Sequence, residues 1–165
     1  MYRSIRATIW AATIPLIGCQ AAPTEDLPLV TPPDPKSRFL VANQKGEVLL
    51  AANQILEYRW DTHTLVVMPG VDGLLRKSLQ RSDLIGGVPF VVIADGVPSY
   101  SGVFTTSYSS LSQDCPVIDV EPVEKQPYRI TIQLGYPSRG FFRGEDPRGH
   151  ERIRNVLQDL GKLRE

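Results

Sequence analysis

The chain has 165 residues, of which 42% are hydrophobic and 22% are charged, enough material to bury the core of one globular domain. Eighteen Lys and Arg residues balance eighteen Asp and Glu residues, so the chain lacks the basic surplus that is typical of nucleic-acid-binding proteins. Its two cysteines are too few for a disulfide-stapled scaffold. No uninterrupted apolar run reaches the roughly 20 residues that a membrane-spanning helix needs.

The start of the chain has the pattern of a secretory signal. Two positive charges, Arg3 and Arg6, precede an apolar stretch over residues 7–17 that has the length of a signal core. The stretch PLIGCQAAP closes this leader, and its Leu-Ile-Gly-Cys segment resembles the lipobox of bacterial lipoproteins. In that motif an aliphatic residue stands three positions before the cysteine, and a small residue immediately precedes it. We therefore predict a signal peptide over residues 1–18 and a mature chain that begins at Cys19.

The resemblance to bacterial lipoproteins implies a lipid anchor on Cys19. In that family the cysteine thiol carries a diacylglycerol and the new amino group is usually acylated, and each methylene buried in the bilayer contributes about 0.8 kcal/mol. Gln20, in place of Asp, is typical of passage to the outer membrane. We expect an exported protein of the cell envelope, anchored on the outer membrane and facing the periplasm. The alternative is an ordinary secretory signal, cut after Ala22.

A proline-rich segment follows the predicted anchor. Five prolines interrupt residues 20–38 and prevent a regular helix or strand there. As an extended spacer rising about 3.1 Å per residue, this segment could hold a domain up to roughly 60 Å from the bilayer. We predict the lipidated cysteine and a tether over residues 19–38, and a single domain over residues 39–165.

The predicted domain begins with short β-rich runs that are separated by turn signals. Hairpins are expected around Lys45-Gly46, around Asp61-Thr62 and, most strongly, around Asp95-Gly96, where glycine accepts the positive φ of a tight turn. Residues 55–60 alternate with the period of a half-buried strand. The sequence predicts further strands over residues 115–122 and 128–135.

Two helices are expected among these strands. Val71, Leu74, Leu75 and Leu79 have helical spacing in the middle of the chain. A second helix is expected over residues 147–160, with Asp146 as its N-cap. The predicted class is α+β: a mostly antiparallel sheet of about five to seven strands built from hairpins, with the mid-chain helix and the C-terminal helix packed on it.

The richest candidate for a binding site is the stretch over residues 135–154. It contains five arginines, and guanidinium groups bind phosphate and carboxylate groups through paired hydrogen bonds. The possible ligand-binding residues are Arg139, Phe141, Phe142 and Arg143. In the alternative interpretation the two phenylalanines anchor the loop to the core. The remaining arginines, which lie away from the apolar stripe of the C-terminal helix, are then solvated: Arg148, Arg152 and Arg154.

Metal-binding and catalytic patterns are weaker. The potential ligands Glu145, Asp146, His150 and Glu151 match no strong metal signature, so no metal is predicted. The hydroxyl-rich run over residues 105–113 could supply a nucleophile to His63 or His150, but it lacks the context of a nucleophile elbow. We therefore assign no catalytic residue and no cofactor.

Cys115 is the second cysteine. If Cys19 carries lipid, the two cannot pair, and a lone thiol in an oxidising compartment is expected to be buried as a small apolar side chain at a strand start.

Taken together, the sequence favours a lipid-anchored envelope protein that acts as a non-enzymatic binding or interaction module. Its expected contacts are the membrane, through the anchor, and an envelope protein, a lipid headgroup or a wall polymer, but no nucleic acid. The alternative is a small envelope hydrolase or a metal-assisted enzyme, built from residues 145–151 or from the hydroxyls of residues 105–113.

Overall fold

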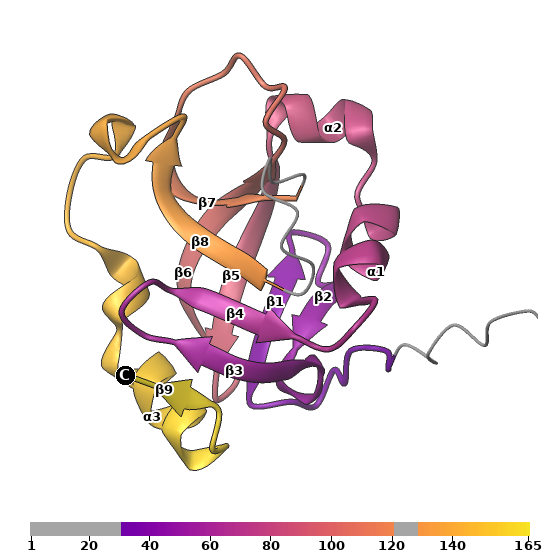
Figure 1. The fold of residues 1–165 in the computed structure, drawn as a ribbon, viewed down its shortest axis with the longest axis vertical. Coiled ribbons are helices and arrows are strands. Elements are labelled where there is room, and N and C mark those ends of the chain that lie inside the picture. The colour runs from indigo at the N-terminus through magenta and orange to yellow at the C-terminus, as the bar shows by residue number, and fades with distance from the viewer. Residues whose placement is uncertain (1–30, 121–128) are drawn as a thin grey trace, which may run out of the picture.

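The computed structural model describes residues 31–120 and 129–165, which form one mixed sheet of nine strands with three α-helices (Figure 1). The strand order across the sheet is β2-β1-β5-β6-β7-β8-β4-β3-β9. The strands span Phe39–Asn43 (β1), Val48–Ala51 (β2), Ile55–Arg59 (β3), Thr64–Val67 (β4), Val88–Ala94 (β5), Val97–Thr105 (β6), Gln113–Asp119 (β7), Arg129–Tyr136 (β8) and Leu163–Arg164 (β9).

The three predicted hairpins are confirmed. Strand pairs β1/β2, β3/β4 and β5/β6 are each antiparallel and are joined by the expected turns. The turn between β5 and β6 has positive φ at both central residues, 51° at Asp95 and 73° at Gly96. That is the backbone of a tight hairpin turn whose twist matches the twist of its strands.

The strand count and the direction of pairing differ from the prediction. Nine strands replace the expected five to seven, and two pairs are parallel, β6 with β7 and β3 with β9. The first parallel pair arises because the loop between β6 and β7 returns the chain to the same end of the sheet. The second arises because the chain continues past the C-terminal helix into β9, and a strand of two residues has too little pattern to be read from sequence.

The helices also differ in number. The mid-chain helix is confirmed as α1 (Val71–Ser78), but a second short helix, α2 (Arg81–Gly86), follows it directly. The C-terminal helix is divided into a 3-10 turn, η3 (Pro147–Gly149), and the helix α3 (Glu151–Asp159). Asp146 caps η3, whereas the His150 ring accepts the hydrogen bond from the Arg152 backbone N–H that caps α3. The remaining 3-10 turns are η1 (Ala52–Gln54) and η2 (Arg139–Phe141).

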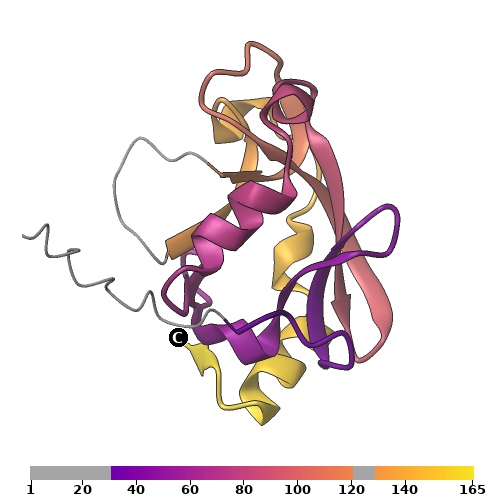
Figure 2. The same cartoon turned by 90° about the vertical axis from the view of Figure 1, so that its right-hand side faces the viewer.

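The sheet is strongly curved, and its two halves face each other across the core. Figures 1 and 2 show α1 beside one opening of this curve and α3 below it. Core side chains come from both halves, and the Phe39 ring on β1 meets the Tyr58 ring on β3 edge to face, with centroids 6.4 Å apart. An irregularity in the β3/β4 register between Ile55 and Glu57 shifts the alternation predicted for β3. Ile55 and Tyr58 are therefore buried, while Leu56 is exposed.

The described end of the predicted tether lies against the domain. The Gln54 side chain donates to the Thr31 carbonyl, the Asn53 side chain donates to the Pro32 carbonyl, and Arg38 forms ion pairs with Asp95 and Asp159. Within residues 31–120 and 129–165, no helix is long and apolar enough to cross a membrane.

Candidate functional site

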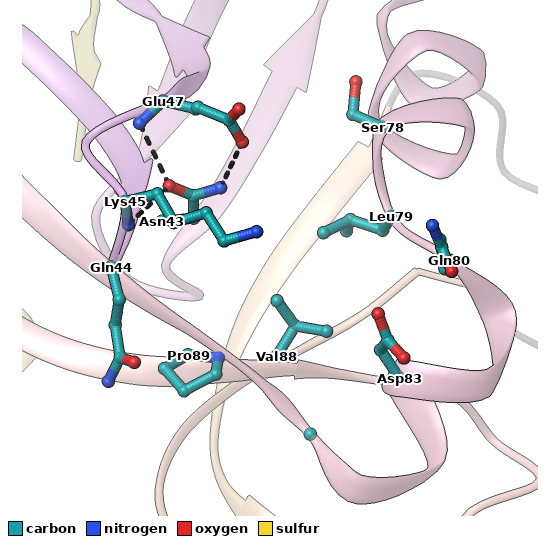
Figure 3. A pocket seen from close by; sticks show the side chains of 11 residues that line it. Asn43, Gln44, Lys45, Glu47, Ser78, Leu79, Gln80, Asp83, Val88 and Pro89 are labelled. Atoms are coloured by element: carbon teal, nitrogen blue, oxygen red, sulfur yellow. Dashed lines mark hydrogen bonds between the residues drawn. The ribbon is translucent and has the colours of Figure 1, made fainter.

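An open groove of about 360 Å³ lies between the β1–β2 turn and the junction of α1 with α2 (Figure 3). Its floor is aliphatic, formed by Leu79 at the end of α1 and by Val88 and Pro89 at the start of β5. Its walls are polar. The residues that line the groove are Asn43, Gln44, Lys45, Glu47, Ser78, Leu79, Gln80, Asp83, Gly87, Val88 and Pro89.

The β1–β2 turn is held in shape by the side chain of Asn43. Its Oδ1 accepts hydrogen bonds from the backbone N–H groups of Lys45 and Glu47, at 2.9 and 3.0 Å. Its Nδ2 donates to the Glu47 carboxylate at 2.6 Å. Gly46 supplies the positive φ of 80° that this turn requires. One wall of the groove is therefore rigid up to the base of the Lys45 side chain.

The charged groups of the groove stand on opposite walls. Figure 3 shows the Lys45 amino group extended toward the middle of the groove, with the Asp83 carboxylate of α2 on the far side. Among the residues that the structure describes, no carboxylate lies within 4 Å of the Lys45 amino group to form an ion pair. Asp83 accepts only a 3.2 Å hydrogen bond from its neighbour Ser82 within the same described part. Both charges are thus available to a ligand.

A second group of polar and charged side chains surrounds Arg148, a buried residue that is 8% exposed. Arg148 donates two hydrogen bonds to the Asp146 carboxylate, at 2.9 and 2.6 Å, and one to the Ile132 carbonyl of β8 at 2.5 Å. The hydrogen bonds from Arg148 hold the pKa of Asp146 at about 2, against the opposing effect of partial burial. Arg148 therefore links the loop before α3 to the sheet. The predicted solvated role of Arg148 is wrong.

His63 and Tyr58 lie in the electrostatic field of this ion pair. The Tyr58 hydroxyl and His63 Nδ1 are 2.9 Å apart, and both side chains are buried. Burial raises the pKa of Tyr58, so its hydroxyl keeps its proton. Burial, and then the positive charge of Arg148, lower the pKa of His63. The ring is thus kept neutral. We name Tyr58, His63 and Arg148, together with the exposed Asp146 that pairs with Arg148, the buried polar cluster.

The predicted binding residues of the 135–154 stretch lie on η2 and just after it. Phe141 is 45% exposed, whereas Phe142 is half-buried and packs on Gly135 of β8. Arg139 and Arg143 are both exposed, and the Arg143 backbone N–H donates to the Asp114 carboxylate. These four residues share one surface loop, but the groove does not include them.

The potential metal ligands of residues 145–151 do not gather into one site. Asp146 is paired with Arg148, and the His150 ring serves as the cap of α3. Within the described part of the chain, no three His, Cys, Asp or Glu side chains are placed to hold a metal ion.

Two hydroxyls of the run over residues 105–113 donate to backbone carbonyls of α2. The Thr105 hydroxyl donates to the Leu84 carbonyl, and the Ser109 hydroxyl donates to the Ile85 carbonyl at 2.7 Å. These bonds fix the β6–β7 loop onto α2. His63, the proposed base, is engaged with Tyr58 instead.

Cys115 is half-buried on β7 rather than enclosed in the core. Burial, and then the neighbouring charge of Asp114, raise the pKa of its thiol, which keeps it protonated and unreactive. Cys19, Gln20 and the rest of the leader lie outside the described residues.

The sequence reasoning missed the groove. The sequence predicts Lys45 only as part of a turn and does not predict α2, which supplies Asp83. A local signal for the turn existed, because Asn43 precedes Lys45-Gly46 by two residues and Asn side chains often bond to backbone N–H groups two residues on. No local signal brings Asp83 across from Lys45, since the two residues stand 38 positions apart in the sequence.

Comparison of this chain with family models, with curated proteins and with solved structures found no match.

Proposed function

We propose that this chain is a lipid-anchored protein of the bacterial cell envelope whose domain binds a ligand in the groove between the β1–β2 turn and α2. The proposal of a lipid anchor is supported by the lipobox-like segment that ends at Cys19. The expected location is the outer membrane, on its periplasmic side. The domain acts as a binding module and performs no chemistry on its ligand.

The observation that carries the binding role is the presence of charges on opposite walls of an open groove. A buried charge that serves the fold is paired, as Arg148 is with Asp146. Lys45 and Asp83 are instead exposed, face the same space and hold no ion pair among the described residues. Polar groups converging over an apolar floor are the usual composition of a small ligand site.

The enzymatic alternative draws less support. It requires a base beside a nucleophile or a set of metal ligands. The described residues proposed for those roles contact other groups: His63 contacts Tyr58, Asp146 contacts Arg148, and Ser109 contacts the Ile85 carbonyl.

The anchor is tested by growing cells with a labelled fatty acid. We expect the wild-type protein to carry the label and the Cys19→Ser variant to lose it. Cys115→Ser is the matched control, because it removes the other cysteine and should leave labelling intact. Equal labelling of wild type and Cys19→Ser would exclude the anchor.

The binding role is tested with the mature chain, residues 19–165, carrying Cys19→Ser so that it remains soluble. Three probes represent the chemistry of the envelope: inorganic phosphate, N-acetylglucosamine and the dipeptide L-Ala-L-Ala. Backbone amide NMR shifts should change at Lys45 and Asp83 with at least one of them. Shifts confined to residues 139–143 would instead move the site to the η2 loop, and the absence of any shift would contradict a binding role for the groove with these probes.

A further inference from the structure

Resting on the proposed role of the groove, we infer that its ligand is a short zwitterionic peptide. The peptide carboxylate pairs with Lys45 on the β1–β2 turn, and its free ammonium group pairs with Asp83 on α2.

The charges of the groove favour a ligand that carries both signs. Lys45 is the only cation among the lining residues, and it stands between the carboxylates of Glu47 and Asp83 (Figure 3). A phosphate or another simple anion would meet Lys45 but would be repelled by both carboxylates. A simple cation would meet Asp83 but would be repelled by Lys45. A ligand that carries both a positive and a negative charge can pair with Lys45 and Asp83 at the same time.

The two carboxylates are not equivalent. Glu47 already accepts a 2.6 Å hydrogen bond from the Asn43 side chain, which ties it to its own turn. The Asp83 carboxylate receives only the weak local bond from Ser82, so it is the better partner for an ammonium group. The polarity of the ligand follows: its amino end points to α2 and its carboxyl end to the β1–β2 turn.

The floor and the size of the groove favour a peptide over a sugar. Leu79 is almost fully buried, and together with Val88 and Pro89 it offers an aliphatic surface on which small side chains pack. The lining contains no aromatic ring on which a sugar face could stack. The Gln80 side chain has no hydrogen-bond partner among the described residues, and its amide can pair with a peptide unit. About 360 Å³ lies near the small end of the range of about 300–1,000 Å³ for ligand sites, which suits two or three residues.

The test compares L-Ala-L-Ala with its N-acetylated form and its C-terminal amide, using calorimetry on the mature chain carrying Cys19→Ser. Each cap removes one charge, and we expect each to weaken binding about tenfold or more, as the loss of a charge-assisted hydrogen bond does. Lys45→Gln should weaken binding of the free dipeptide by a similar factor, and in that variant the C-terminal amide should bind almost as well as the free dipeptide. In Asp83→Asn, the N-acetylated dipeptide should likewise bind almost as well as the free one.

Two control variants separate these local effects from a change in net charge. Lys77→Gln removes an exposed lysine of α1 that does not line the groove. Asp61→Asn removes an exposed aspartate whose only bond among the described residues, at 3.2 Å from the neighbouring Thr62 hydroxyl, matches that of Asp83. Both controls should bind the dipeptide as the parent chain does.

The inference is overturned if the capped dipeptides bind as tightly as the free one, or if Lys45→Gln binds no more weakly than Lys77→Gln. Binding of phosphate or N-acetylglucosamine in the groove, without the dipeptide, would also overturn it while leaving the proposed binding role intact. If none of the three probes shifts the groove, the inference and the proposed role fail together.

Discussion

The domain gathers charged side chains in two places, and the two differ in what surrounds the charges. In the buried polar cluster, Arg148 is 8% exposed and directs its donors to Asp146 and to the Ile132 carbonyl. In the groove, the side chains of Lys45 and Asp83 are exposed and face each other across open space. One set of charges is satisfied within the protein, and the other is satisfied only by solvent.

The difference separates a role in the fold from a role in binding. A charge taken out of water costs several kcal/mol unless a partner compensates it, so burial forces Arg148 into a paired geometry. An exposed charge stays hydrated and needs no partner, so its placement contributes little to stability. Substitutions at the two places should therefore affect different measurements.

The largest effect is expected from Arg148→Met. The substitution keeps much of the aliphatic volume but leaves the Asp146 carboxylate and the Ile132 carbonyl without their donor. Leaving the buried Ile132 carbonyl without its donor costs about 1–3 kcal/mol of the free energy of unfolding, while the exposed Asp146 carboxylate can be solvated. Denaturant unfolding followed by circular dichroism should show that loss.

The matched control for this substitution is Arg152→Met. Arg152 belongs to the same segment and is half-buried, and no ion pair of its side chain is found among the described residues. The Arg152→Met variant should lose no more than about 0.5 kcal/mol of the free energy of unfolding. Similar losses at both positions would show that Arg148 is not the link between this segment and the sheet.

The second prediction concerns the stability of the cluster at low pH. The folded-state pKa of His63 is lowered from 6.5, so the unfolded chain binds the proton more readily, and stability falls as the pH drops below about 6.5. Protonation would also make His63 Nδ1 a donor toward the Tyr58 hydroxyl and place a second cation near Arg148. The pKa of Asp146 is lowered from 3.8 to about 2 in the folded state. After allowance for its partial exposure, protonation of Asp146 lowers the free energy of unfolding by a further roughly 1–2 kcal/mol between about pH 4 and pH 2.

Unfolding curves measured at a series of pH values test this dependence. In the His63→Gln variant the free energy of unfolding should change less between pH 7 and pH 5 than in the wild type. In the Asp146→Asn variant it should change less below pH 4. A wild-type stability that stays constant from pH 7 to pH 5 would contradict the assignment to His63.

Local patterns in the sequence were sufficient for the hairpins and for two of the helices. The tight turn at Asp95-Gly96 is encoded by two adjacent residues, and the apolar spacing from Val71 to Leu79 is encoded within nine positions. The same local reasoning could not find the parallel pairing of β6 with β7, because that pairing depends on where a whole loop returns to the sheet. It also missed the bulge that places Leu56 outside, which comes from the register with β4.

The candidate site was harder to predict than the fold, since its charges come from separate segments. The arginine-rich stretch over residues 135–154 is the predicted binding site, yet Arg148 in that stretch has a structural role. It precedes α3 on the separate turn η3, and its side chain is buried. Helical spacing extended back from α3 placed it on the solvent side. The placement of Lys45 and Asp83 on opposite walls of one groove is set by the tertiary structure and not by local sequence.

The smallest effect on stability is expected from substitutions in the groove. Lys45→Gln and Asp83→Asn remove charges that no described residue compensates, so each should change the free energy of unfolding by less than about 0.5 kcal/mol. The same two variants are those expected to weaken dipeptide binding. Denaturant unfolding and calorimetry on one preparation of each variant would test both expectations. A loss of several kcal/mol at Lys45 would mean that its charge serves the fold, as Arg148 does, and the distinction between the two regions would then fail.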